Sequence, residues 1–288
     1  MIHIILRHSD AQISRGGRRQ ARWRGSLILW LVLLLAACGP SDSGGLTVTG
    51  STSVTPFAEH LAELYQKQHP GVAINIQGLG SSAGIRAALD GVAEIGMSSR
   101  DLQPEEADKL EQIVIARDAL AVIVNPDNPI TDLSTAQIQG IFGGQIRNWD
   151  AVGGSSLPIT VVGREAGSGT FSAFEELVMK GKPTATLALR QGSNGAIRQI
   201  VAQDPNAIGY ISLGIVDPTV KALAIDSVAP SVEHVEAGTY KLVRPFLLVW
   251  RKGQPLSPLG KAFVDYVMGA EGQSELLKAG LVKGSTTP

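Results

Sequence analysis

The chain has 288 residues, of which 44% are hydrophobic and 5% aromatic, with 33 glycines, one cysteine, 25 basic and 26 acidic residues. This composition excludes an intrinsically disordered chain, a small disulfide-stabilised domain and a strongly basic nucleic-acid binder. A chain well above the usual length of one domain is long enough for two compact lobes or one large domain.

Positive charge is concentrated at the N-terminus. Residues 1–37 contain six arginines and one acidic residue, which leaves 19 basic and 25 acidic residues after position 37, a net charge of -6. The basic lead precedes the apolar run 26–35, which is too short and wrongly flanked for a permanent membrane span. The pattern predicts a secretory signal peptide over residues 1–37, and therefore an exported protein.

The apolar run ends in Leu35-Ala36-Ala37-Cys38-Gly39, which resembles the lipobox of bacterial lipoproteins. The alternative is an ordinary signal peptide followed by a chance cysteine, because such a cleavage site requires only small residues. The resemblance implies that Cys38 becomes the acylated first residue and holds the protein on a membrane surface by its acyl chains. Residues 38–45 would then form a short flexible tether.

From residue 46 onward, short β-like runs alternate with amphipathic helical runs, the pattern of an α/β protein. The predicted strands are Leu46–Thr49, Val72–Gln77, Ile95–Met97, Ile113–Ala116, Ala119–Val124, Ile159–Val162, Ile208–Ile211, Lys221–Ile225 and Val243–Trp250. Thr55 is the expected cap of the first helix, with Pro56 at its first position. Three helices carry apolar stripes that are expected to be core: Phe57, Leu61, Leu64 and Tyr65; Ile85, Ala88, Leu89 and Val92; Phe171, Phe174, Leu177 and Val178.

A turn rich in Gly, Ser and Thr precedes each of these three helices, at residues 50–55, 78–84 and 164–170. A helix N-terminus presents unpaired backbone N–H groups and about half a positive charge, and glycine lets a ligand approach the backbone. One such turn by itself is more simply a capped helix start. Three in one chain, with Arg164 beside the third, favour a site for a tetrahedral oxyanion, because a guanidinium donates to two oxygens at once.

In its ordered motifs the chain resembles the phosphate-binding proteins of bacterial ABC-type importers. The matching blocks are Gly50–Pro56, Gly78–Gly84, Ile95–Arg100, Asn148-Trp149, Gly163–Thr170, Ala207–Tyr210 and the Gly272-Gln273 helix. The resemblance implies an α/β periplasmic-binding-protein (type II) fold, in which two α/β lobes joined by two crossover strands close over the ligand. It places the first lobe in residues 46–119 and 243–288, and the crossovers and second lobe in residues 120–242.

The resemblance also implies a function in the cell envelope, in the periplasm or on the outer face of a membrane. The protein would bind inorganic phosphate with high affinity and deliver it to the permease and ATPase subunits of an ABC importer. It would act as a monomer, with no cofactor, metal, nucleic acid or enzymatic reaction. Arg164 would be the charged clamp, with Ser81, Ser168 and Thr170 as hydroxyl donors. The family's site residues correspond here to Thr52, Ser53, Val54, Ser81, Arg164, Ser168, Gly169 and Thr170.

Ser99 departs from the pattern of many family members, which have Asp at this position. That Asp accepts a hydrogen bond from a protonated phosphate oxygen and repels fully ionised sulfate. Other branches, which this shorter chain resembles more closely, also have Ser-Arg here. Glu165 and Asp101 are alternative acceptors, although Glu165 also suits a role in holding Arg164. Our hypothesis is that Ser99 belongs to the phosphate site and that hydroxyl and backbone acceptors supply the selectivity.

Two further features leave alternatives open. Residues 192–195 precede a helix and either add donors to the cleft or only cap that helix. Arg100 follows a predicted strand and either attracts the anion or is solvated or ion-paired. Trp149, Tyr210 and Trp250 are assigned to the core or to the surface of a lobe.

Enzymatic alternatives lack supporting residues. Residues 78–83 match a loose dinucleotide-binding pattern, but residues 98–100 read Ser-Ser-Arg where the supporting acid is expected. A hydrolase elbow at Ser168 fails because Ala166 and Thr170 occupy its glycine positions. The histidines that follow the signal peptide lack metal-ligand spacing: His60, His69 and His234.

Two alternatives to phosphate uptake remain at this level. One is a binding protein for another tetrahedral oxyanion, such as sulfate, molybdate or tungstate. The other is a signalling lipoprotein that has the same fold and no role in transport. In each case the net charge of -6 after residue 37 gives no broad attraction for anions, so specificity has to come from the local site.

Overall fold

The computed structural model describes residues 45–185 and 189–284. The predicted signal peptide and Cys38 lie outside the described residues, as does the predicted tether apart from Gly45. Among the described residues, no helix is long and apolar enough to cross a membrane.

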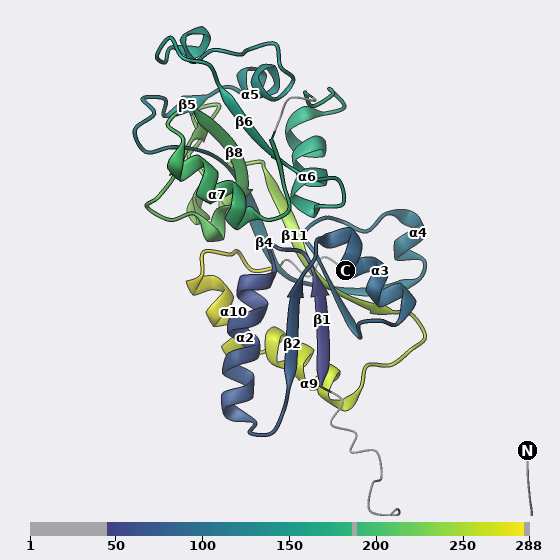
Figure 1. The fold of residues 1–288 in the computed structure, drawn as a ribbon. Coiled ribbons are helices and arrows are strands. Elements are labelled where there is room, and N and C mark those ends of the chain that lie inside the picture. The colour runs from purple at the N-terminus through teal and green to yellow at the C-terminus, as the bar shows by residue number, and fades with distance from the viewer. Residues whose placement is uncertain (1–44, 186–188, 285–288) are drawn as a thin grey trace, which may run out of the picture. The chain divides into compact units, whose positions relative to one another are not determined.

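The first lobe is built on a sheet with β1 (Leu46–Gly50) between two parallel neighbours, β2 (Ile74–Gly78) and β3 (Ile95–Ser98). The long strand β11 (Val243–Arg251) continues this sheet antiparallel to β3. Helices α2 (Thr55–Gln68), α9 (Pro258–Met268) and α10 (Ala270–Lys278) cover one face, and α3 (Ser81–Asp90) covers the other, with the short α4 (Pro104–Ala107) nearby (Figure 1).

Alternation along β11 explains how one strand serves both faces of that sheet. Phe246 and Leu248 pack in the core under α2 and α9. Leu247 and Val249 pack in the smaller core under α3. Successive side chains of a strand point to opposite faces, so an uninterrupted apolar run is what a strand buried on both sides requires.

The second lobe contains β8 (Ala207–Ser212), which is parallel to β6 (Thr160–Arg164), and β7 (Leu189–Gln191) continues the sheet. One face packs on α5 (Thr135–Phe142) and on α6 (Gly169–Phe174) with the π-helical turn η2 (Glu175–Met179), and the other packs on α7 (Asn194–Gln203). The remaining elements are short: β5 (Asp132–Leu133), η1 (Trp149–Val152), η3 (Leu213–Ile215), β9 (Lys221–Ala222), β10 (Ala224–Ile225) and α8 (Val232–Glu236).

The predicted strands Ile113–Ala116 and Ala119–Val124 are one continuous strand, β4 (Leu110–Val124). Residues 110–119 pair with β11, and residues 120–124 pair with β8, so β4 runs from one lobe into the other (Figure 1). The expected break at Arg117-Asp118 does not occur, because both residues find partners. The backbone of Arg117 bonds to Val282 in both directions, and Asp118 forms an ion pair with Arg244.

Three other sequence predictions were inaccurate. The stripe of α3 does not include Val92, because α3 ends at Asp90 and the left-handed Gly91 leaves Val92 78% exposed. Thr55 is the first helical residue of α2, and Val54 is its cap. The predicted strand Lys221–Ile225 splits into β9, which pairs with β4, and β10, which pairs with β5. Such two-residue strands are too short to show an alternating pattern.

Candidate functional site

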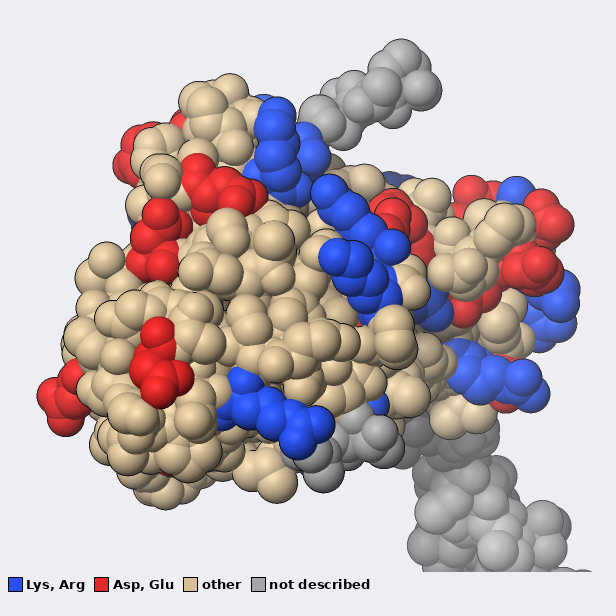
Figure 2. All heavy atoms as spheres, turned by 90° about the horizontal axis from the view of Figure 1, so that it is seen from above, with Lys and Arg blue, Asp and Glu red and all other residues tan. Residues whose placement is uncertain are grey.

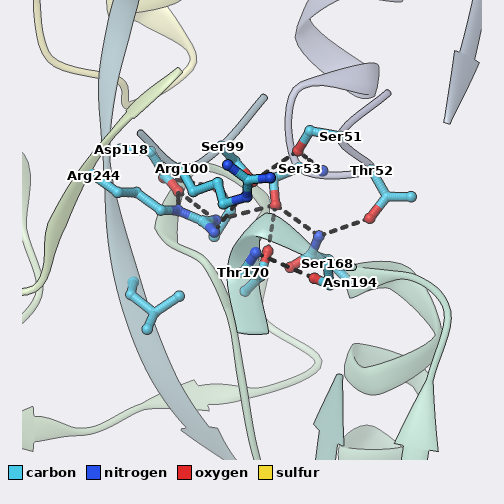
Figure 3. Close-up of polar contacts among 12 residues, drawn as sticks. Ser51, Thr52, Ser53, Ser99, Arg100, Asp118, Ser168, Thr170, Asn194 and Arg244 are labelled. Carbon is cyan, nitrogen blue, oxygen red and sulfur yellow. Dashed lines mark hydrogen bonds and ion pairs between the residues drawn. The ribbon is translucent and has the colours of Figure 1, made fainter. Parts of the chain in front are cut away.

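The three predicted Gly, Ser and Thr turns meet between the two lobes. Ser53 follows β1, Thr170 lies in the first turn of α6, and their hydroxyl oxygens are 2.8 Å apart. A Cβ atom added at Gly169 would overlap the hydroxyls of Ser81 and Ser99, so the absence of a side chain there permits this close approach. Figure 3 shows the resulting cluster of polar side chains.

Three serines of the first lobe contribute neutral hydroxyls to the cluster. The Ser51 hydroxyl donates to Ser99 Oγ at 2.8 Å, and Ser81 Oγ lies 3.3 Å from the same oxygen. The Ser99 amide donates to Ser81 Oγ at 3.1 Å. All three side chains are buried. Hydroxyl hydrogens rotate, so these groups can donate to each other or to a ligand.

Arg164, the predicted charged clamp, lies in the second lobe and is 1% exposed. Its Nη2 donates to Thr52 Oγ1 at 3.1 Å, and its Nη1 lies 3.4 Å from Thr170 Oγ1. Burial, together with the positive charge of Arg244, lowers the pKa of Arg164 to about 10. The guanidinium is therefore still charged at neutral pH and directs its N–H groups towards hydroxyls of both lobes.

Backbone groups, not a carboxylate, hold Arg164 in place. Its Nε donates to the Gln191 carbonyl at 3.1 Å, and its Nη2 also donates to the Gly192 carbonyl at 2.9 Å. Glu165, one expected partner, is exposed. The Arg164 backbone amide donates to the hydroxyl of Tyr210, whose ring stacks on Phe174 at 3.9 Å between centroids. The core of the second lobe thereby fixes this arginine.

A second buried cation, Arg244 in β11, was missed by the sequence analysis. It is 3% exposed; its Nη2 donates to Ser53 Oγ at 3.1 Å, and its Nη1 lies 3.5 Å from Ser99 Oγ. Its Nε and Nη2 also donate to Asp118 Oδ2, at 3.0 and 2.9 Å. Burial lowers the pKa of Arg244 and raises that of Asp118, and the attraction between the two opposes both shifts. The only sequence signal was a charged residue inside each of two apolar strands.

Asn194, the first residue of α7, reaches the cluster from the second lobe. Its amide nitrogen donates to Ser53 Oγ at 2.9 Å and to Thr52 Oγ1 at 3.2 Å. The neighbouring Ser193 caps α7 by accepting a hydrogen bond from the Ala196 amide at 3.1 Å. Both interpretations of residues 192–195 therefore apply, because one residue caps the helix and the next reaches the cluster.

Some polar groups of the predicted turns already have partners within the protein. The Val54 amide donates to the Ser51 carbonyl at 3.0 Å, and the Thr170 amide donates to Ser168 Oγ at 3.2 Å. Ser168 Oγ also accepts from the Phe171 amide at 3.3 Å, so this hydroxyl is the N-cap of α6. The turns thus combine helix capping with the placement of side chains in the cluster.

Arg100 is ion-paired, which is one of the alternatives that the sequence left open. Its two terminal nitrogens donate to the two carboxylate oxygens of Glu106 at 2.7 and 2.8 Å. Asp101, the other alternative acceptor, is exposed and accepts from Arg100 through its backbone carbonyl at 2.8 Å. Neither Asp101 nor Glu165 therefore supplies a buried acceptor to the cluster.

The cluster as a whole suits a small anion. It combines two buried guanidinium groups, one carboxylate that is already paired, and several hydroxyl groups from both lobes. Within residues 45–185 and 189–284, no group of three or more His, Cys, Asp or Glu side chains is placed to hold a metal ion. Figure 2 shows several basic side chains near the middle of the surface seen from above, with acidic side chains on either side of them.

The sequence of this chain is similar to those of known proteins. A model for the PBP superfamily domain matches residues 36–271. The phosphate-binding protein PstS of Bacillus subtilis (strain 168) is 31% identical over 241 residues, covering 82% of this chain and 79% of that protein. The phosphate-binding protein PstS of Pseudomonas aeruginosa is 33% identical over 270 residues, covering 83% of each.

The fold of this chain is similar to those of solved structures. A crystal structure from Clostridium perfringens, described as a phosphate ABC transporter substrate-binding protein with bound phosphate, is 43% identical with a TM-score of 0.80, and covers 84% of this chain and 100% of that chain. An ABC-type phosphate transport receptor from Vibrio cholerae is 38% identical with a TM-score of 0.69, and covers 83% of this chain and 100% of that chain. The similarity therefore includes both lobes.

Proposed function

This chain belongs to the periplasmic-binding-protein superfamily and, within it, to the PstS phosphate-binding proteins, and from that premise we propose that it binds inorganic phosphate outside the cytoplasm. It delivers the ion to the permease of an ABC importer and catalyses no reaction on it. The observation that carries this proposal is the meeting of two buried arginines, Arg164 and Arg244, with hydroxyl groups of both lobes.

The charges of the cluster support an anionic ligand. Arg164 and Arg244 are both buried, and repulsion between their positive charges makes the charged form of Arg164 less favourable. Asp118 neutralises only one of these charges. A phosphate ion would supply the missing negative charge, and Arg164 can donate to its oxygens through a planar fork. We assign the contacts with phosphate to Thr52, Ser53, Val54, Ser81, Ser99, Arg164, Ser168, Gly169 and Thr170.

The contribution of both lobes supports a hinge-type receptor. Ser53 and Ser81 belong to the first lobe and Arg164 and Thr170 to the second, so one ion contacts both lobes only when they are close together. Binding therefore favours the closed form over an open one. We place the lobe boundaries at residues 46–119 with 243–288, and at residues 120–242, and expect β4 and β11 to be the crossover strands.

Calorimetric titration of the purified protein, freed of bound anion by unfolding and refolding, tests this function. We expect saturable 1:1 binding of phosphate with a micromolar or lower Kd, and much weaker binding of sulfate. Binding of molybdate, tungstate or sulfate in preference to phosphate would contradict the assignment of ligand. No binding of any of the four anions would instead favour a signalling lipoprotein.

We also propose that acylated Cys38 anchors this receptor to a membrane, on the basis of residues 35–39. Cys38→Ser should move the protein from the membrane fraction to the soluble fraction, because no acyl chain can be attached. Its affinity for phosphate should not change, since Cys38 precedes both lobes. The measurement is fractionation followed by titration, with Ser41→Ala in the tether as the matched control. A Cys38→Ser variant that still sediments with membranes would exclude acyl anchoring at this residue.

A further inference from the structure

One polar atom in the cluster has no partner. Asn194 is 1% exposed, and within residues 45–185 and 189–284 its Oδ1 is the only buried side-chain nitrogen or oxygen that has no hydrogen bond. The amide nitrogen faces the first lobe and donates to Ser53 Oγ at 2.9 Å and to Thr52 Oγ1 at 3.2 Å. Burial of an amide oxygen without a donor is unfavourable, because the oxygen gives up its hydrogen bonds with water.

Other candidate acceptors in the cluster are already in use. Asp118 Oδ1 accepts from the Ser212 hydroxyl at 2.7 Å, and Oδ2 accepts from two nitrogens of Arg244. Ser99 Oγ accepts from the Ser51 hydroxyl at 2.8 Å and lies 3.5 Å from Arg244 Nη1. Ser99, at the family's Asp position, can therefore accept few further hydrogen bonds. Asn194 Oδ1 accepts none from the described residues and is free to accept one from a ligand.

The side chain of Asn194 also lies in the right place. Figure 3 shows it between the Thr52 and Ser53 turn of the first lobe and the Ser168 and Thr170 turn of the second. The hydroxyls that its nitrogen contacts, Thr52 and Ser53, in turn contact Arg164, Thr170 and Arg244. An anion held by the two arginines would thus be next to this amide.

We propose that Asn194 Oδ1 accepts the hydrogen bond of a protonated phosphate oxygen and thereby selects phosphate over sulfate, an inference that rests on the proposed function. Phosphate at neutral pH carries at least one O–H group, whereas sulfate carries none. Bound sulfate would leave Oδ1 without a donor, with oxygen lone pairs facing one another. A site built to bond an O–H group rejects an analogue that lacks it far more strongly than a difference in size would allow. The discrimination comes from the missing proton, since the amide has no charge.

Titration of the full chain with phosphate, arsenate and sulfate tests this role. Arsenate also carries a proton at neutral pH, so the native protein should bind phosphate and arsenate and reject sulfate. Asn194→Ala should lower the ratio of phosphate affinity to sulfate affinity by about tenfold or more, because the acceptor is lost. Asn194→Asp should keep or raise this ratio, since a carboxylate accepts the same bond and repels sulfate.

The ratio separates selectivity from a structural role. If Asn194 acted only through its hydrogen bonds to Thr52 and Ser53, their loss would lower the affinity for both anions alike. The ratio of phosphate affinity to sulfate affinity would then stay unchanged. Ser193→Ala, which removes the cap of α7 and keeps the Asn194 amide, is the control and should also leave it unchanged. If Asn194→Ala weakens the binding of phosphate and of sulfate equally, the inference is overturned. Phosphate binding by the native protein would still uphold the proposed function. Failure of the native protein to bind phosphate would overturn both.

Discussion

Replacement of Arg164 with alanine is expected to weaken phosphate binding by about 2–5 kcal/mol. Arg164 is 1% exposed, and its guanidinium donates to Thr52 and lies next to Thr170, so alanine would leave the anion without a buried charge partner. Calorimetry measures the loss directly. The far-UV circular dichroism spectrum should not change, because the variant keeps the Arg164 backbone, which pairs with β7 and donates to the Tyr210 hydroxyl.

Two further variants show whether charge or geometry is responsible. Arg164→Lys keeps the positive charge but loses the planar fork, so it should recover only part of the affinity. Arg147→Ala removes an exposed arginine from the same lobe and should have no effect. A Kd for phosphate that does not change in Arg164→Ala would place the site elsewhere in the protein.

Asp118→Ala is expected to lower the free energy of unfolding by about 3–5 kcal/mol, because it leaves Arg244 as an unpaired charge in the interior. Asp118 and Arg244 are 1% and 3% exposed, and they join β11 to β4 close to the point where β4 begins to pair with β8 of the other lobe. Urea denaturation without phosphate measures the change. Asp265→Ala breaks the exposed Lys261–Asp265 pair and should cost less than about 1 kcal/mol.

A double variant separates the two roles of the pair. Asp118→Leu combined with Arg244→Met replaces both charges with apolar groups, so it should recover most of the lost stability. Its affinity for phosphate should stay below that of the native protein, because methionine cannot replace the hydrogen bond from Arg244 Nη2 to Ser53. Full phosphate affinity in the double variant would show that Arg244 has only a structural role.

The local content of the fold could be predicted from the sequence. Short β-like runs predicted the principal strands of both sheets, and apolar stripes predicted the helices α2, α3 and α6. The turns before these helices supplied residues that meet in the cluster, among them Ser53, Arg164 and Thr170. Periodicity and capping depend on residues within a few turns of one another, so they can be recognised without the tertiary structure.

Charged residues in strands could not be interpreted in the same way. Arg117 and Asp118 divide an apolar run, and the sequence alone predicted two strands there. The structure has one strand, because Arg244 neutralises Asp118 from a position 126 residues away. A buried charge is stable only with its partner, and strand pairing brings that partner into contact.

The sequence by itself therefore determined the α/β class, the ordered motifs of the family and most of the polar side chains available for an anion. The tertiary structure decided which of them meet. Ser53 is 117 residues from Thr170, 141 from Asn194 and 191 from Arg244, yet its hydroxyl contacts all three. Contacts at such separations depend on strand order and on how the lobes close, and no local pattern in the chain records either one.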